Sequence, residues 1–394
     1  MSEIKTLIKF DNLPIANNLS EDMNIKNPEF DLHIVFDEET KLVQLHNNVK
    51  PEFLFNDTYV YDSSQSKTMV NHFKEAAINL YDRFKPNKVL EIGSNSGIFV
   101  NNFIDLTDVI AVEPCGNFAD LTNNMNIKTY PKYWNKDVVE TILKEDGKQD
   151  LIFSANTISH VQNLEECLEL ISKCLTKKGV FVIEAPSFLE VLKNNTFDQF
   201  YHEHQSYFSY ISLSNVLSKA GLEIFDVEFY PVHGGSYRYY IGKNKEYNKV
   251  SINCEKVLKS ELSYGVDSYE KVKDRMDIMK RNMIEIKNKL ENLTSEGNIV
   301  IGYGATAKLI QVVHMCGLNE NLIKYVVDTT LDKQGRYIPN TNIQIRKYDN
   351  NCLNGVDYCF LGAWNYKDEI LKKEKQFTKD GGKFMTHVPE VSII

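Results

Sequence analysis

The sequence predicts an α/β protein that contains two α/β units joined by a helical segment. After about residue 71, apolar segments with strand character alternate with helix-like segments, an alternation typical of a parallel sheet covered by helices. The first strand of each unit runs into a glycine-containing turn, "EIGSNSG" in one unit and "GYGATAK" in the other. We therefore expect a small β-rich domain at 1–70, an α/β domain at 71–250, a linker helix at 251–295 and a second α/β domain at 296–394.

The overall composition argues against several classes of protein. The chain has 394 residues, of which 42% are hydrophobic and 25% charged, and its net charge of −9 argues against binding to nucleic acids or anionic membranes. Its N-terminal segment lacks the apolar run of a signal peptide, and no apolar run approaches the roughly 20 residues of a membrane span. The cysteines are scattered, odd in number and never in a C-x-x-C pair, which is typical of reduced thiols in a cytoplasmic protein. They are Cys115, Cys167, Cys174, Cys254, Cys316, Cys352 and Cys359.

The expected elements of the first half follow in order along the chain. Residues 30–36 and 41–46 have the pattern of short strands, and a helix is expected at 66–84. The first α/β unit is expected to contain strands at 88–93, 108–114, 149–155 and 179–186, a helix at 164–175, and a helix, strand, turn and strand within 213–242.

The second half begins with a long helical pattern that breaks near Gly265. Its apolar residues recur at spacings of three and four, which could indicate a coiled coil or dimer helix, or a linker helix that packs on its own domains. We favour the second interpretation because the stripe is only about three heptads long. The stripe is Tyr269, Val272, Met276, Met279, Met283, Ile286 and Leu290. The last α/β unit then has a strand, turn and helix within 298–317 and strands at 323–330, 356–364 and 381–388.

The first glycine turn indicates a class of cofactor. Its spacing is G-x-x-x-G, with an acidic residue two positions before it, whereas a pyrophosphate binder favours G-x-G-x-x-G. A carboxylate beside the loop suits the sulfonium and amino groups of S-adenosylmethionine, and Glu113, 20 residues after Gly93, could accept both ribose hydroxyls. Nicotinamide binders share that acidic residue, and an α/β domain that binds nothing there is a further alternative. The loop residues are Glu91, Gly93, Ser94, Asn95 and Gly97.

Several longer motifs resemble one enzyme family. "YVYDSSQSKTMVNHF", "FDQFYHEHQSYFSY", "DVEFYPVHGGSYRYY" and "VVDTTLDKQGRYIPNTNIQI" resemble the sugar C-methyltransferases that act on nucleotide-linked 4-keto-deoxysugars. The resemblance covers nearly the whole chain. It implies a class I S-adenosylmethionine-dependent methyltransferase domain, a small N-terminal domain and a second Rossmann-like C-terminal domain, with methyl transfer to carbon 3 of the sugar and S-adenosylhomocysteine as product.

One departure from the family concerns metal. Members of the family typically carry four zinc-binding cysteines near the N-terminus, but the first cysteine of this chain is Cys115. A metal site requires its ligands. We therefore expect a zinc-binding-like N-terminal domain that has lost its zinc ligands.

The "YHEH" stretch has the residue types that carbon methylation requires. A ketone at carbon 4 acidifies the carbon-3 proton, and a histidine that titrates near neutrality can remove it. The resemblance assigns this base to His204. It also implies catalytic roles for Tyr201, Glu203 and Tyr61. Glu203 would either contact a sugar hydroxyl or orient a histidine. His202 could instead form only a structural hydrogen bond, and a metal held by His202 and His204 is a further alternative, although a clear third ligand is missing.

The remaining site residues follow from the same resemblance. Asn156 and His160 join the cofactor site, and a nucleotide-diphosphate sugar is the expected partner, with the second glycine turn and Lys308 near its diphosphate. That turn could instead be purely structural, as could His233. The predicted substrate-binding residues are Tyr59, Ser63, His202, His233, Gly234, Gly235, Arg238, Tyr303, Lys308 and Lys333.

Two alternatives to this function remain from the sequence. The second glycine turn is compatible with an NAD(P)-dependent oxidoreductase or epimerase acting on a nucleotide sugar. The other alternative is a non-enzymatic scaffold that lost its activity together with its zinc. The intact "YHEH" set argues against this alternative. We expect a cytoplasmic monomer or small homo-oligomer without nucleic-acid or membrane partners.

Overall fold

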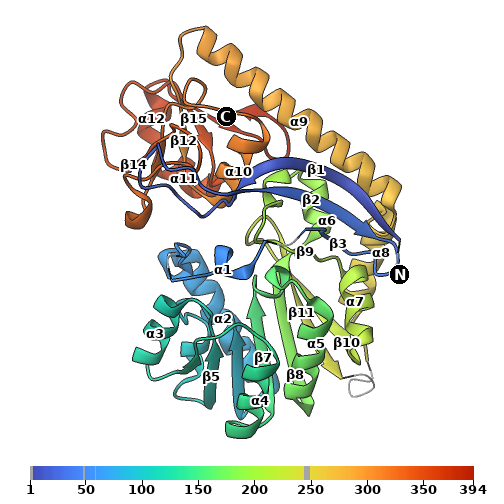
Figure 1. Cartoon of the computed structure of the whole chain (residues 1–394). Helices are drawn as coiled ribbons and strands as arrows, with labels where there is room; N and C mark the ends of the chain where they lie inside the picture. The colour runs from blue at the N-terminus through green and yellow to red at the C-terminus, as the bar shows by residue number, and fades with distance from the viewer. Residues whose placement is uncertain (1–2, 48, 58, 244–248) are drawn as a thin grey trace.

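The computed structural model describes residues 3–47, 49–57, 59–243 and 249–394. A methyltransferase-like sheet with its helices forms the lower half of Figure 1, and a second α/β unit forms the upper left. A long, bent N-terminal hairpin runs beneath the long helix α9 along the top of the molecule (Figure 1).

The first α/β unit is built on a seven-stranded sheet with the order β10-β11-β8-β7-β4-β5-β6. Neighbouring strands are parallel except for β11, which is antiparallel to both β8 and β10. This is the strand order of class I methyltransferases, so the carboxyl ends of β4, β5 and β7 meet at one edge, where ligands bind in open α/β sheets. The strands are β4 (Lys88–Ile92), β5 (Asp108–Val112), β6 (Lys128–Tyr130), β7 (Gln149–Ala155), β8 (Leu175–Pro186), β10 (Leu222–Tyr230) and β11 (Ser236–Lys243).

Helices cover both faces of this sheet. One face packs its apolar residues against α4, α5, α7 and α8, and the other packs against α2 and a 3-10 helix at Val100–Phe103. The helices are α2 (Lys67–Phe84), α3 (Gly116–Asn124), α4 (Lys136–Glu145), α5 (Leu164–Cys174), α6 (Phe188–Lys193), α7 (Tyr210–Lys219) and α8 (Ile252–Tyr264). Helix α2 starts where the sequence predicts, because the Ser66 side chain accepts a hydrogen bond from the Met69 backbone N–H and caps it.

The N-terminal sheet has the strand order β1-β2-β3-β9 and is antiparallel. Its last strand comes from far along the chain, directly after the "YHEH" stretch. The strands are β1 (Ile4–Pro14), β2 (Glu29–Asp37), β3 (Val43–Leu45) and β9 (Ser206–Tyr207). The first part of the chain therefore contributes three strands of a sheet that β9, just after the "YHEH" stretch, completes.

The C-terminal unit is a six-stranded sheet with the order β14-β13-β12-β15-β16-β17, parallel apart from β17. Its strands are β12 (Val300–Tyr303), β13 (Val326–Asp328), β14 (Ile345–Lys347), β15 (Tyr358–Leu361), β16 (Lys383–Thr386) and β17 (Ser392–Ile393). Its helices are α10 (Ala307–Met315), α11 (Lys367–Lys373) and α12 (Lys375–Lys379).

The long helix α9 (Tyr269–Ser295) follows a break at Gly265, whose φ of 83° is the left-handed conformation that ends α8. Six of the seven residues of its apolar stripe, Val272 to Leu290, are buried in one core with the N-terminal strands and the C-terminal unit, and Tyr269 packs against that core. The stripe is thus covered by its own chain. No helix in the described residues is both long and apolar enough to cross a membrane.

Candidate active site

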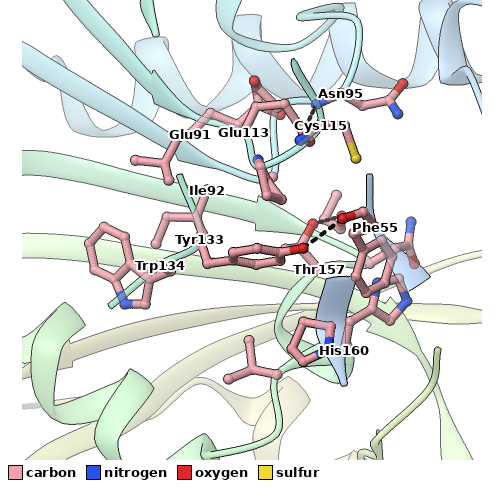
Figure 2. A pocket seen from close by; sticks show the side chains of 18 of the residues that line it. Phe55, Glu91, Ile92, Asn95, Glu113, Cys115, Tyr133, Trp134, Thr157 and His160 are labelled. Carbon is pink, nitrogen blue, oxygen red and sulfur yellow. Dashed lines mark hydrogen bonds between the residues drawn. The ribbon is translucent and has the colours of Figure 1, made fainter. Parts of the chain in front are cut away.

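A cavity of about 310 Å³ lies at the carboxyl ends of β4, β5 and β7. Its wall includes two carboxylates, Glu91 in β4 and Glu113 directly after β5, together with the apolar rings of Phe55 and Trp134 and the imidazole of His160 (Figure 2). Most of the predicted cofactor residues line it, namely Glu91, Gly93, Ser94, Asn95, Glu113, Asn156 and His160.

The glycine loop owes its shape to three positions with positive φ, namely Asn95 at 47° and the two glycines. Gly93 has φ 74° and Gly97 φ 75°, and a Cβ on Gly93 would lie 2.1 Å from the Thr157 hydroxyl oxygen. Gly97 closes the turn with a backbone hydrogen bond to Ser94, 2.8 Å long. Gly97 therefore shapes the loop without itself lining the cavity.

Glu113 holds the glycine loop to the end of the next strand. One carboxylate oxygen accepts from the Asn95 backbone N–H at 2.7 Å, and the other accepts from the Cys115 backbone N–H at 2.9 Å. Burial raises the pKa of Glu113, and it raises the pKa of Glu91 well above its ordinary value. Each Glu113 oxygen retains a lone pair for a ligand hydroxyl.

A segment that we call the strap lines this cavity. It comprises residues 49–57 and 59–66 and includes helix α1 (Pro51–Leu54) and a 3-10 helix at Ser63–Gln65. The Tyr133 hydroxyl donates to the Phe55 carbonyl at 2.6 Å, which is the dashed contact at the centre of Figure 2. The Gly116 N–H donates to Asp57 at 2.9 Å. These contacts tie the strap to the far wall of the cavity.

The strap also meets the glycine loop directly. The Asn95 side chain donates to the Tyr61 carbonyl at 2.8 Å and accepts from the backbone and hydroxyl of Ser63, each at 3.0 Å. Tyr59, Tyr61 and Ser63, which the sequence predicted for the catalytic and substrate sites, therefore line the same cavity as the glycine loop.

The cofactor predicted from the sequence fits this cavity. Its wall supplies two carboxylates, apolar rings and the buried Ser94 hydroxyl, which has no hydrogen-bond partner among the described residues. An unpaired buried hydroxyl at the wall is available to a ligand.

A column of rings connects the cavity to the "YHEH" stretch. The Phe55 and His160 rings stack at a centroid separation of 5.2 Å, and the His160 and His204 rings stack at 5.2 Å. Tyr201 packs on His204 at 4.0 Å. Burial lowers the pKa of His160 to about 4, so its ring is neutral at pH 7. His160 thus stands between the cofactor cavity and His204.

The "YHEH" stretch forms turns, not a strand, between a 3-10 helix at Phe197–Gln199 and β9. The His204 Nδ1 lies 2.8 Å from the Gln199 carbonyl oxygen, and because a carbonyl only accepts, Nδ1 carries the proton. Burial, together with His160 and Lys308, holds the pKa of His204 well below its ordinary value. The neutral ring therefore has its free lone pair on Nε2.

Glu203 is a buried carboxyl on which several segments converge. One oxygen accepts from the Asn17 side chain at 2.7 Å, and the other accepts from the Tyr59 hydroxyl at 3.2 Å. Burial raises the pKa of Glu203 to about 7, while these two hydrogen bonds and the charge of Lys333 oppose the rise. Neither of these hydrogen bonds orients a histidine, and contact of Glu203 with a substrate hydroxyl stays a prediction.

His202 points toward the N-terminal sheet. Its Nε2 donates to the Phe30 carbonyl on β2 at 3.2 Å, whereas His204 bonds to Gln199. The two rings therefore have different partners, and the strand geometry needed for shared chelation is absent. Within the described ranges, no three histidine, cysteine, aspartate or glutamate side chains form a group that could hold a metal ion.

A polar cluster joins the 3-10 helix just before the "YHEH" stretch to the C-terminal unit. Asp198 accepts from Trp364 Nε1 at 2.6 Å and from His387 Nε2 at 3.1 Å. Burial lowers the pKa of Lys308, opposed by Asp198, and its ammonium lies 5.8 Å from the centre of the Trp364 ring. Burial lowers the pKa of His233 to about 4, and the charge of Lys308 contributes to this shift.

The turn at His233 packs against this cluster. Its residues have positive φ, 53° at His233, 93° at Gly234 and 110° at Gly235, and a Cβ on Gly234 would lie 2.6 Å from the Trp364 ring. The Gln199 side chain donates to the His233 carbonyl at 3.0 Å. Gln199 thus holds His204 with its backbone and the His233 turn with its side chain.

Three predicted substrate residues have their polar groups bonded within the protein. Arg238 is 1% exposed and pairs with Glu184 at 2.7 Å, and the Tyr303 hydroxyl donates to Glu374 at 2.6 Å. Lys333 donates to the Ala305 carbonyl at 2.9 Å. The charge of Lys333 also lowers the pKa of Glu203 in the "YHEH" stretch.

Sequence reasoning missed several residues that the structure brings to the site. From a segment distant in sequence, Asn17 bonds to Glu203 in the "YHEH" stretch. The cavity wall contains the Tyr133–Phe55 hydrogen bond, and Asp198 binds Trp364 of the C-terminal unit. Asn17 lies in "LPIANNL", a segment without a motif that would mark it as part of a site.

Known proteins match this chain over most of its length. Residues 69–227 match the profile described as a methyltransferase domain, and residues 231–389 match the profile described as a C-methyltransferase C-terminal domain. The chain is 30% identical over 394 residues to the C-methyltransferase NovU of Streptomyces niveus, covering 98% of this chain and 94% of that protein.

Solved structures resemble only part of the chain. The CcbJ methyltransferase of Streptomyces caelestis has a TM-score of 0.35 at 15% identity, covering 43% of this chain and 89% of its own. A DhpI–SAH complex has a TM-score of 0.33 at 18% identity, covering 47% and 92%. The match to NovU spans both α/β units and the N-terminal sheet. The chain belongs to the family of S-adenosylmethionine-dependent C-methyltransferases.

Proposed function

We propose that the acceptor is carbon 3 of a nucleotide-linked 4-keto-deoxysugar and that His204 is the base that removes its proton. The observation that carries this proposal is the geometry of His204: its proton is fixed on Nδ1 by Gln199, and its ring stacks on His160 in the wall of the cofactor cavity. A base beside the methyl donor is what carbon methylation requires.

When bound, S-adenosylmethionine supplies an electrophilic methyl group and leaves as S-adenosylhomocysteine. Glu91, Glu113, Ser94 and the glycine loop would hold it, with the strap closing over it and excluding water.

His204 takes the carbon-3 proton onto Nε2, and the electron pair of the broken C–H bond becomes an enolate on the 4-keto group. Carbon 3 of this enolate would then bond to the methyl group, while the carbon–sulfur bond of the donor would break and leave its electron pair on sulfur. Burial raises the pKa of Tyr201 well above its ordinary value, so this phenol keeps its proton. A neutral phenol can donate a hydrogen bond to the developing enolate oxygen.

The C-terminal unit would bind the nucleotide. Helix α10 begins at a capped N-terminus, where the Thr306 side chain accepts from the Leu309 N–H, and Lys308 brings an ammonium to the same end. Backbone N–H groups at a helix start and a lysine both favour a diphosphate.

The test is methyl transfer to a panel of nucleotide-linked 4-keto sugars, read by mass spectrometry, with the labelled position assigned by NMR. A mass gain of one methylene with a new carbon–carbon bond at carbon 3 is the expected result. Methylation of oxygen, or transfer only to acceptors without a ketone, would refute the proposal. Thermal shifts with S-adenosylmethionine and with nicotinamide dinucleotides separate the methyltransferase from an oxidoreductase using the second glycine turn.

A further inference from the structure

We propose that Asn17, in the N-terminal domain, is a positioning residue that holds the Glu203 carboxyl in place for the substrate. Its side-chain amide donates to one Glu203 oxygen at 2.7 Å across 186 residues of sequence. The role that we give to Glu203 rests on the proposed function, but the contact itself does not.

The backbone on either side of Asn17 is anchored. Before it, Leu13, Ile15 and Ala16 are buried in apolar cores. After it, Ser20 exchanges two backbone hydrogen bonds with Tyr337 of the C-terminal unit, at 3.1 and 2.8 Å. Because the backbone is already held on both sides of Asn17, this segment loses little further conformational freedom when the side chain bonds to Glu203.

Glu203 needs such a donor because it is 2% exposed. A buried carboxylate is costly unless donors or cations surround it. Four other groups face it: Tyr59 from the strap, Tyr201 from its own stretch, Cys115 from the end of β5, and Lys333 from the C-terminal unit. Of these, Tyr59 is a direct donor at 3.2 Å and Lys333 is the cation.

Each carboxyl oxygen therefore has one neutral donor from outside the "YHEH" stretch. Asn17 holds the first oxygen and Tyr59 the second. Two donors on different oxygens fix the plane of the carboxyl group and leave lone pairs free to accept from a sugar hydroxyl. The N-terminal domain thereby contributes directly to the catalytic site.

The neighbouring Asn18 provides a matched control. It has the same side chain in the same turn, but it is exposed and donates to Asn27 at 3.0 Å. Asn17→Ala and Asn18→Ala thus remove chemically identical groups that differ in whether they reach Glu203. Asn17→Gln keeps the amide donor.

The experiment titrates the Glu203 carboxyl by NMR of protein labelled with ¹³C at the glutamate carboxyls, with Glu203→Gln assigning the resonance. In Asn17→Ala the midpoint of the Glu203 titration should rise above the wild-type value, because the Glu203 carboxylate loses a hydrogen-bond donor. Asn18→Ala should leave the midpoint unchanged, and Asn17→Gln should restore it at least in part. Turnover should fall about tenfold in Asn17→Ala, the effect expected for losing a hydrogen bond to a charged group.

An unchanged midpoint in a folded Asn17→Ala protein would overturn the proposal, even if turnover fell, because the loss would then be structural. Should Asn17→Ala fail to fold, Asn17→Ser, which shortens the donor, is titrated in the same way, and an unchanged midpoint there overturns the proposal as well. The titration requires no substrate. If wild type transfers no methyl to a keto sugar while the Asn17→Ala midpoint still moves, the proposed function fails and the positioning role stands.

Discussion

The Nδ1 of His204 lies 2.8 Å from the carbonyl oxygen of Gln199, and this single contact fixes which nitrogen of the imidazole can act as a base. Because the partner is a backbone carbonyl, the contact survives any change of the Gln199 side chain. The ring is neutral at pH 7, since its pKa is held well below the ordinary value by burial.

Replacing His204 by Asn should leave both ligands bound and remove most turnover, by about 10²–10⁴-fold, as is typical when a general base is lost. Exchange of the carbon-3 hydrogen with deuterated solvent in the presence of S-adenosylhomocysteine reads the proton step directly. Wild type should exchange and the Asn variant should not. If His204→Asn exchanges at the wild-type rate while Tyr201→Phe or His202→Asn does not, the base lies elsewhere in the stretch.

Activity should rise with pH through neutrality because of Glu203. Burial raises its pKa to about 7, so the carboxylate that accepts a substrate hydroxyl forms only as the pH passes that value. His204, whose pKa is lowered, is already in its base form there and adds no limb to the profile. The profile of kcat/KM between pH 6 and 8 should flatten in Glu203→Gln. A limb that persists unchanged in that variant would assign it to another group.

Glu113→Ala should weaken binding of S-adenosylhomocysteine by about tenfold or more, corresponding to about 1.4 kcal/mol. The variant loses the ribose acceptor and leaves the Asn95 and Cys115 backbone N–H groups without their partner. Isothermal calorimetry measures the effect. Asp120→Ala, on an exposed position of α3, is the control for loss of a nearby charge, and equal affinities in the two variants would contradict this placement of the cofactor.

Tyr133→Phe should speed release of S-adenosylhomocysteine. The variant loses one neutral hydrogen bond to the strap, at Phe55, which is worth about 1 kcal/mol or roughly fivefold in rate. Stopped-flow displacement measures the release. Tyr130→Phe is matched in chemistry, because its hydroxyl bonds to Asp146 and Glu145 instead of to the strap, and it should release at the wild-type rate.

The purified protein should contain less than stoichiometric zinc, because its N-terminal region lacks the cysteines that would bind it. Elemental analysis after dialysis is the measurement. One zinc per chain would direct attention to His33 and His46, whose ring centres lie 5.0 Å apart on the N-terminal sheet.

Local patterns predicted the α/β units because their signals are local. The strand and helix periodicities between 88 and 186 lie within single elements, and the glycine turn at Gly93 needs positive φ whatever surrounds it. Six of the seven strands of this sheet were therefore predicted from the sequence, whereas β6, only three residues long, was not. The heptad stripe of α9 was compatible with either a second chain or its own chain as cover, and its short length favoured its own chain, which the structure confirms.

Contacts between distant segments could not be predicted in this way. Asn17 and Glu203 are 186 residues apart, and a short polar residue near a turn carries no sign of its partner. The same holds for β9, a strand of two residues that completes the N-terminal sheet. Arg238 illustrates the same point: the family resemblance placed it in the substrate site, but its salt bridge to Glu184, 54 residues away, is not visible in the sequence.

The composite N-terminal sheet also constrains how the chain can mature on the ribosome. The β1–β2 hairpin emerges first, but the helix that covers it begins at Tyr269, roughly 230 residues after β2 ends, which at 5–20 residues per second means roughly 10–50 s of synthesis. During that interval its apolar residues Leu7, Leu32 and Ile34 are made without their final covering. The methyltransferase unit can form meanwhile, because its seven strands all lie before residue 244. A nascent chain that stalls before α9 thus exposes the uncovered apolar face of the N-terminal sheet, which makes it prone to aggregation.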